Sequence, residues 1–141
     1  MKLKAILASL LALASPSFAA EGGYTIVVSK ATHDDAKWKP VVETLVKKHE
    51  GEVLTYAKDV SEVLPKLRES FPKHTCFVAT PEESTRKFVA IVHQMTRVLD
   101  DDPYTDTMWG ILTGYDAACA LRIAQTEKPL TINKVASGTE V

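Results

Sequence analysis

Short apolar runs alternate with amphipathic segments along most of this chain. Five runs rich in β-branched and aromatic residues are typical of buried strands: Tyr24–Ser29, Val53–Tyr56, Thr75–Ala79, Met108–Leu112 and Leu130–Val135. Apolar residues at helical spacing between them predict helices over Trp38–Lys48, from Ser61 to Phe71, from Thr80 to Asp100 and over Asp116–Ala124. This alternation predicts a doubly wound α/β fold, with a mostly parallel sheet of about five strands and helices on both faces.

The clearest helix start in the sequence is Thr80-Pro81-Glu82-Glu83. Thr80 can cap the helix, Pro81 suits its first position, and Glu83 completes a capping box. Apolar residues then continue on one face down to Asp100. We therefore expect the longest helix of the protein to begin at this box.

Ligands of open α/β sheets bind beyond the carboxyl ends of the strands. That rule selects three loops, each of which opens a predicted helix with free backbone N–H groups: Lys30–Asp35, Thr80–Glu82 and Thr113–Asp116. None contains a glycine-rich phosphate loop or a dinucleotide fingerprint. The substrate-cleft candidates in these loops are Thr32, His33, Thr113, Gly114, Tyr115 and Asp116.

Helix capping and solvation account for much of this loop chemistry. His33, Asp34 and Asp35 offer a metal ligand or a base, but capping is the favoured interpretation. Gly114 permits a tight turn and Asp116 can cap, so a structural turn is favoured there as well. The acidic residues from Asp100 to Asp106 lack the spacing of a calcium loop. We expect no metal site and no cofactor.

His74 and Cys76 invite comparison with a cysteine-protease pair, but their placement is poor for catalysis. Two residues apart on one strand, their Cα atoms lie about 6–7 Å from each other. Cys76 also lies in an apolar run, where a thiolate is disfavoured. No catalytic residue is therefore assigned. The apolar surroundings of Cys76 and Cys119 favour two buried thiols, with a disulfide as the alternative.

The first nineteen residues have the three-part layout of a secretory signal peptide. Lys2 and Lys4 precede the apolar run Ala5–Ala14, and Ser17-Phe18-Ala19 offers a cleavage site. Ten residues span about 15 Å as a helix, against a hydrocarbon core of about 30 Å, which disfavours a membrane anchor. The missing polar face disfavours a retained amphipathic helix. We expect a signal peptide over 1–19, an α/β domain over 20–141 and a secreted or periplasmic protein.

Composition limits the partners of the exported domain. The formal net charge of the full chain is −1 at pH 7, and removal of Lys2 and Lys4 with the leader makes it −3, so nothing marks a nucleic-acid interface. No later stretch is long and apolar enough to predict a membrane span. The fifth predicted strand has no helix after it to cover the sheet, so we expect self-association through the uncovered sheet.

The segment from Asp101 to Ala124 resembles part of the gingipain-type cysteine peptidases. In that family an aspartate precedes an aromatic strand, followed by a turn containing Gly and Asp and a short stretch with an Arg. The matching positions are Asp106, Trp109, Gly114, Asp116 and Arg122. The order of the upstream strands and of a helix with Trp and Lys is similar too, so the resemblance covers most of the exported domain.

This resemblance implies a caspase-like fold whose catalytic His and Cys lie on later strands, beyond Val141. It adds Asp106 to the substrate-cleft candidates. We therefore expect the N-terminal scaffold half of a longer peptidase domain, without the catalytic dyad, which meets a peptide or protein substrate through its parent protein. The alternative is a small secreted or periplasmic α/β binding or interaction domain without catalysis.

Overall fold

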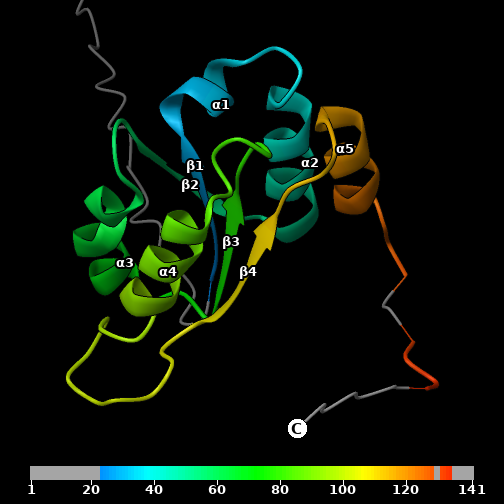
Figure 1. The fold of residues 1–141 in the computed structure, drawn as a ribbon. Helices are drawn as coiled ribbons and strands as arrows, with labels where there is room; N and C mark the ends of the chain where they lie inside the picture. Colours follow the sequence, from blue (N-terminus) through cyan, green and yellow to red (C-terminus); the bar gives the residue numbers. More distant parts are fainter. Residues whose placement is uncertain (1–22, 129–130, 135–141) are drawn as a thin grey trace, which may run out of the picture.

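Four parallel strands form the centre of the molecule (Figure 1). The computed structural model describes residues 23–128 and 131–134. The sheet has the order β2-β1-β3-β4, and its strands are β1 (Tyr24–Ser29), β2 (Glu52–Tyr56), β3 (His74–Val78) and β4 (Met108–Leu112). This is the start of a common doubly wound order, so the predicted fold class is confirmed.

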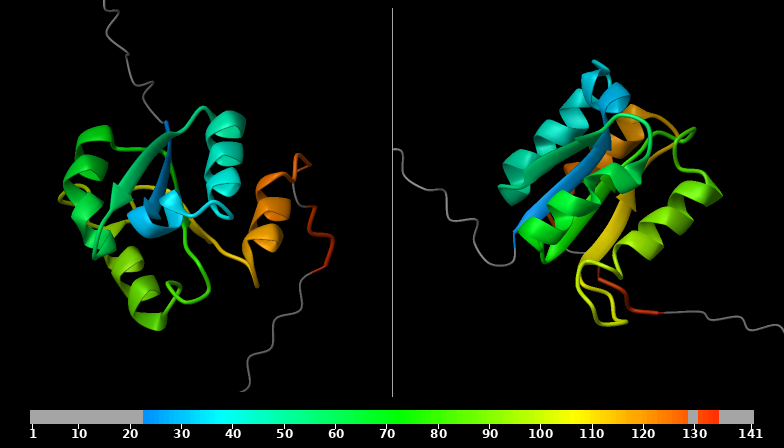
Figure 2. Two further views of the ribbon diagram at one scale, coloured as in Figure 1. Left: turned by 90° about the horizontal axis from the view of Figure 1, so that it is seen from above. Right: turned by 90° about the vertical axis from the view of Figure 1, so that its left-hand side faces the viewer.

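Helices cover both faces of this sheet, in two groups that Figure 2 shows from above. One face packs against α2 (Lys39–His49) and α5 (Ala117–Ala124). The other packs against the 3-10 helix η1 (Val60–Val63), α3 (Leu64–Ser70) and α4 (Arg86–Met95). A short helix, α1 (Lys30–Asp34), follows β1 directly.

Two apolar clusters hold these layers together, one on each face. Side chains alternate between the faces along each strand, so Ile26 and Val28 of β1 join the cluster under α2 and α5, while Val27 joins the other. In β3, Phe77 is fully buried under α4. These central strands bury almost every side chain, as expected for a parallel sheet covered on both faces.

The predicted fifth strand is not part of this sheet. Thr131–Lys134 are exposed and form no regular structure, while Leu130 and Val135 lie outside the described residues. The reason lies in the handedness of strand connections, which are right-handed in about 98% of parallel crossovers. Because α5 lies on the same face as α2, a right-handed crossover from β4 through α5 leads back over β3, so the short segment directly after α5 is not directed to the free edge of β4.

The helix predicted from Thr80 begins later and ends earlier than expected. The Thr80–Glu83 box does form, with Glu83 N donating to Thr80 Oγ1 at 3.2 Å, but it closes a turn. Helix α4 starts at Arg86, where the Thr85 hydroxyl caps Phe88 N. It ends at Met95, because the following backbone is held by Asp106, whose carboxylate accepts from Leu99 N at 2.7 Å.

The other helices lie close to their predicted positions. Asp116 caps α5 as expected, and α2 carries the expected proline in its first turn. The segment from Ser61 divides into η1 and α3, and the cap is Asp59. Helix α1 was not predicted, because its cap is Ser29, the last residue of a strand.

Candidate functional site

The carboxyl ends of all four strands lie at one edge of the sheet, where three loops meet. The loop after β1 leads to helices on one face, and the loop after β3 leads to α4 on the other. The strand order reverses between these two neighbouring strands. In doubly wound proteins, such a switch point opens the crevice in which ligands bind.

Here the carboxylate of Glu83 fills that crevice. The Ser29 hydroxyl donates to Glu83 Oε1 at 2.5 Å, and the Thr32 hydroxyl donates to Oε2 at 2.8 Å. Thr80 N donates to Oε2 as well, at 2.9 Å. One side chain from the β3 loop is thus bonded to two hydroxyls of the β1 loop, and it ties the two diverging loops together.

A second carboxylate occupies the turn after β2. Glu62 accepts hydrogen bonds from three consecutive backbone N–H groups, those of Ala57, Lys58 and Asp59, at 2.9–3.0 Å. These bonds hold the pKa of Glu62 below its usual value. Successive N–H groups of this kind form a concavity that binds anions in many proteins. In this protein the anion is an internal side chain.

The turn after β4 repeats the arrangement. Asp116 caps α5 by accepting from Cys119 N at 2.8 Å, and this bond lowers the pKa of its carboxyl group. Gly114 lies so close to the helix that an added Cβ would meet Ala120 N at 2.8 Å. Carboxylates of the protein itself therefore accept backbone N–H groups in the loops after β2, β3 and β4.

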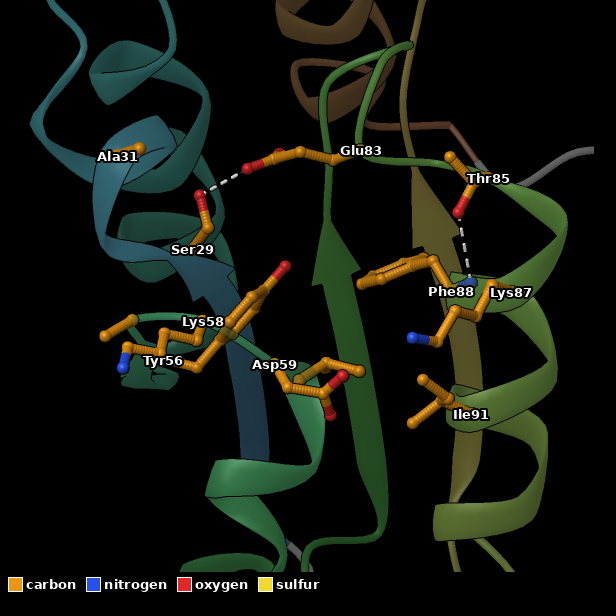
Figure 3. A pocket seen from close by; sticks show the side chains of 12 residues that line it. Ser29, Ala31, Tyr56, Lys58, Asp59, Glu83, Thr85, Lys87, Phe88 and Ile91 are labelled. Atoms are coloured by element: carbon orange, nitrogen blue, oxygen red, sulfur yellow. Dashed lines mark hydrogen bonds between the residues drawn. The ribbon is translucent and has the colours of Figure 1, made fainter.

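A cavity of about 320 Å³ opens beside the Glu83 crevice, between the β2 turn and α4 (Figure 3). Its volume lies at the lower end of the range for small-molecule pockets. Phe88, Ile91 and Val60 supply its apolar lining. Its polar side chains come from β1, β2, the two adjoining loops and α4: Ser29, Tyr56, Lys58, Asp59, Glu83, Thr85 and Lys87.

Tyr56 is the unusual member of this lining. Its side chain is only 7% exposed, and its hydroxyl points into the cavity (Figure 3). Burial raises the pKa of the Tyr56 hydroxyl, and the nearby Glu83 and Asp59 raise it further. Within residues 23–128 and 131–134 this hydroxyl forms no hydrogen bond, and it is not one of the polar side-chain atoms closed off from solvent. It therefore faces the open space of the cavity, where a ligand can reach it.

The charges around the cavity are arranged on two sides. Lys87 directs its ammonium group into the space from α4, opposite the carboxylate of Asp59, whereas Lys58 extends away from it (Figure 3). Asp59 accepts from Ser61 N at 2.9 Å and also from the Ser61 hydroxyl, which lowers the pKa of its carboxyl group. Lys87 forms no ion pair with any described residue.

The predicted cleft residues lie in two separate loops, one after β1 and one after β4. Thr32 is buried and belongs to the Glu83 network, whereas His33 is half-buried beside Asp34, with 3.3 Å between Nδ1 and Oδ1. Thr113, Gly114, Tyr115 and Asp116 do follow β4, at the predicted edge. Tyr115 is 95% exposed and Asp116 is a helix cap.

Asp106 is not part of this edge. It precedes β4, at the opposite end of the parallel sheet, and its carboxylate holds the loop after α4 by bonding Leu99 N. Its expected place in a substrate cleft rests on the resemblance alone and stays a prediction. Asp106 also lies within 4.8 Å of Asp100 and Asp102, measured between carboxylate oxygens. Both of the latter accept backbone N–H groups of their own loop, as a solvated acidic turn does.

The polar residues of the cavity were missed by sequence reasoning. Tyr56 and Ser29 are the last residues of their strands, and the strand pattern identifies them only as sheet-forming residues. A polar side chain that ends a buried strand was the available signal, since that position lies at the ligand-binding edge. Lys87 gave no signal, because its direction depends on where α4 begins.

The cysteines are both free, as predicted. Cys76 is buried, and burial raises the pKa of its thiol against the weaker opposing effect of a hydrogen bond with Tyr24. Cys119 is only half-buried, so the prediction of two buried thiols holds for one. His74 lies near Tyr24 at the amino end of the sheet, with ring centroids 6.2 Å apart, away from the ligand-binding edge.

Among residues 23–128 and 131–134, no helix has the length and hydropathy needed to cross a membrane. Comparisons with protein-family models, with curated proteins and with solved structures found no match to this chain.

Proposed function

We propose that this protein is the exported scaffold half of a gingipain-like, caspase-fold domain, and that its sheet is extended at β4 by further polypeptide. The observation that carries the proposal is the free edge of β4. Among the described residues this strand pairs only with β3. One side of its backbone thus presents N–H and C=O groups to a further strand.

One face of β4 is open as well. Met108 is 57% exposed, and a Cβ added to Gly110 would meet no atom within 4 Å. The register pairs these two residues with His74 and Cys76, which places them on the α5 side of the sheet. Helix α5 packs against Leu112, at the far end of the strand. No described residue therefore gives the first half of β4 the cover that a parallel strand normally has.

The sequence of β4 does not protect this edge. Natural edge strands carry charges, prolines or bulges that prevent pairing with other chains. The opposite edge strand, β2, begins with the exposed Glu52. In contrast, β4 reads Met-Trp-Gly-Ile-Leu, without charge or proline. Its composition is that of a strand with neighbours on both sides.

The resemblance to the gingipain-type peptidases is compatible with this geometry. Trp109 lies in β4, Gly114 in the turn after it, and Arg122 on α5. In the parent enzyme, a cysteine thiolate would attack a peptide carbonyl with the help of a histidine base. This chain would contribute the sheet and the α5 layer, and neither of its cysteines would act as the nucleophile.

The coding frame after Val141 tests this proposal. We expect it to continue into a strand that ends near a histidine and a later strand that ends near a cysteine. The protein made from that frame should cleave peptides, and Cys76→Ala should leave its activity unchanged. A parent protein without such residues, or loss of hydrolysis in folded Cys76→Ala, would contradict the proposal.

A second candidate function is a small exported binding domain without catalysis. The cavity beside Glu83 favours it, because the Tyr56 hydroxyl points into that space and forms no hydrogen bond with a described residue. Ligand binding to the chain itself would support this candidate.

A further inference from the structure

The cavity between the β2 turn and α4 holds an unusual combination of groups. It has an apolar wall, the Tyr56 hydroxyl without a hydrogen bond to a described residue, the Glu83 carboxylate with an unused lone pair, and the ammonium group of Lys87. We propose that this cavity binds a free α-amino acid with an apolar side chain. The proposal develops the second candidate function, and it is independent of the β4 edge.

The inner end of the cavity suits an ammonium group. Glu83 Oε1 accepts one hydrogen bond, from Ser29, whereas a carboxylate oxygen can accept about two. The neighbouring Tyr56 hydroxyl has free lone pairs, and it points into the same space (Figure 3). An ammonium group carries three donors. It can therefore bond to Glu83 and Tyr56 together, and its positive charge offsets that of the Glu83 carboxylate.

The α4 side of the cavity suits a carboxylate. Lys87 extends its ammonium group into the space (Figure 3), and no described residue forms an ion pair with it. A ligand carboxylate on this side would form a charge-assisted hydrogen bond with Lys87. The Asp59 carboxylate disfavours a ligand with only negative charge, and Lys87 disfavours one with only positive charge.

Phe88 and Ile91 line the remaining wall, on the same helix as Lys87. An apolar ligand side chain packed on them would be removed from water, which is favourable in proportion to the area covered. Leucine carries all three recognised groups, so it is the probe of choice. N-acetyl-leucine lacks the ammonium charge, and leucinamide lacks the carboxylate.

Nuclear magnetic resonance titrations of the chain over residues 20–141 test the site with these three probes. We expect leucine to shift the backbone signals of the β2 turn and the first turn of α4. Each singly charged analogue should bind about tenfold more weakly, because it loses one charge-assisted contact. Absence of shifts with leucine, shifts elsewhere on the protein, or equal binding of the three probes would overturn the proposal.

Two variants test the contacts of the Tyr56 hydroxyl and of the Lys87 ammonium group one at a time. Tyr56→Phe removes only the hydroxyl and should abolish most of the leucine shifts, while the matched variant Tyr104→Phe, at an exposed tyrosine of another loop, should leave them unchanged. Lys87→Gln, at an exposed position, should make leucine and leucinamide bind equally. The spectra report the folded state of each variant directly. Unchanged leucine binding by folded Tyr56→Phe would overturn the assignment.

Discussion

The Ser29 hydroxyl donates a hydrogen bond of 2.5 Å to the carboxylate of Glu83, across 54 positions of sequence. This bond joins the loops after β1 and β3 where they part toward opposite faces of the sheet. Thr32 and Thr80 N complete the contact with the same carboxylate. At the switch point of this fold, the space in which a ligand phosphate binds elsewhere is thus taken by a side chain of the protein.

Replacing Glu83 by Gln should destabilise the protein by about 1–3 kcal/mol, because Ser29, Thr32 and Thr80 N lose a charged acceptor. Urea denaturation monitored by circular dichroism measures the change. Glu82→Gln is the matched control, since Glu82 is exposed and forms no hydrogen bond with a described residue. Equal effects of the two substitutions would contradict the role given to Glu83.

Glu62 should make the stability of the fold depend on pH in the acid range. Its pKa is lowered by backbone hydrogen bonds in the native state, so its stabilising effect is complete above the unfolded-state pKa of about 4.3. The effect is lost as pH falls through the lower native pKa. Asp116, whose pKa is lowered by the bond from Cys119 N, should act in the same direction.

Urea denaturation at a series of pH values between neutral and strongly acidic tests this dependence. Glu62→Gln should reduce the loss of stability on acidification. Glu69→Gln, at an exposed glutamate of α3, should not. If both variants follow the wild-type pH profile, the carboxylate of Glu62 does not stabilise the β2 turn.

The two thiols should differ in reactivity toward iodoacetamide under native conditions. Cys119 is half-buried near the start of α5, whereas Cys76 is buried in β3 with a raised pKa. Since the thiolate is the reactive form, Cys119 should be alkylated first, and Cys76 only on unfolding. Mass spectrometry of the digested protein identifies the site, and native labelling of Cys76 at the same rate would refute this prediction.

Export should remove residues 1–19, which lie outside the described part of the structure. The uncharged run Ala5–Ala14 followed by Ser17-Phe18-Ala19 carries this prediction. Mass spectrometry of the exported protein should give an N-terminus at Ala20. A soluble cytoplasmic product that retains Met1 would show that the leader is misassigned.

The fold could be predicted from the sequence where a pattern is local. Strand β4 has its predicted bounds, and Asp116 caps α5 as its position before an apolar segment indicated. The Thr80–Glu83 box was misleading, because the same reciprocal bonds close a turn as well as a helix. The hydrogen bonds from the Ser29 and Thr32 hydroxyls to Glu83 favour the turn over the helix. These bonds join distant segments of the chain, so no local pattern reveals them.

The fifth strand and the cavity were inaccessible to sequence reasoning for a similar reason. Leu130–Val135 has the composition of a strand, but whether a strand can join the sheet depends on the face on which α5 lies. Likewise, the Tyr56 hydroxyl lines a cavity only once α4 lies across from the end of β2. Neither relationship is expressed within a window of neighbouring residues.

Sedimentation velocity over a range of protein concentrations tests whether the edge of β4 is open to pairing with another chain. The wild-type chain over residues 20–141 should associate as its concentration rises, since β4 is an uncharged edge with Met108 57% exposed. Met108→Lys should suppress association without loss of folding, whereas Tyr104→Lys, which changes an exposed residue outside the edge, should not. A wild-type protein that sediments as a monomer at every concentration would contradict the proposal that this edge is open.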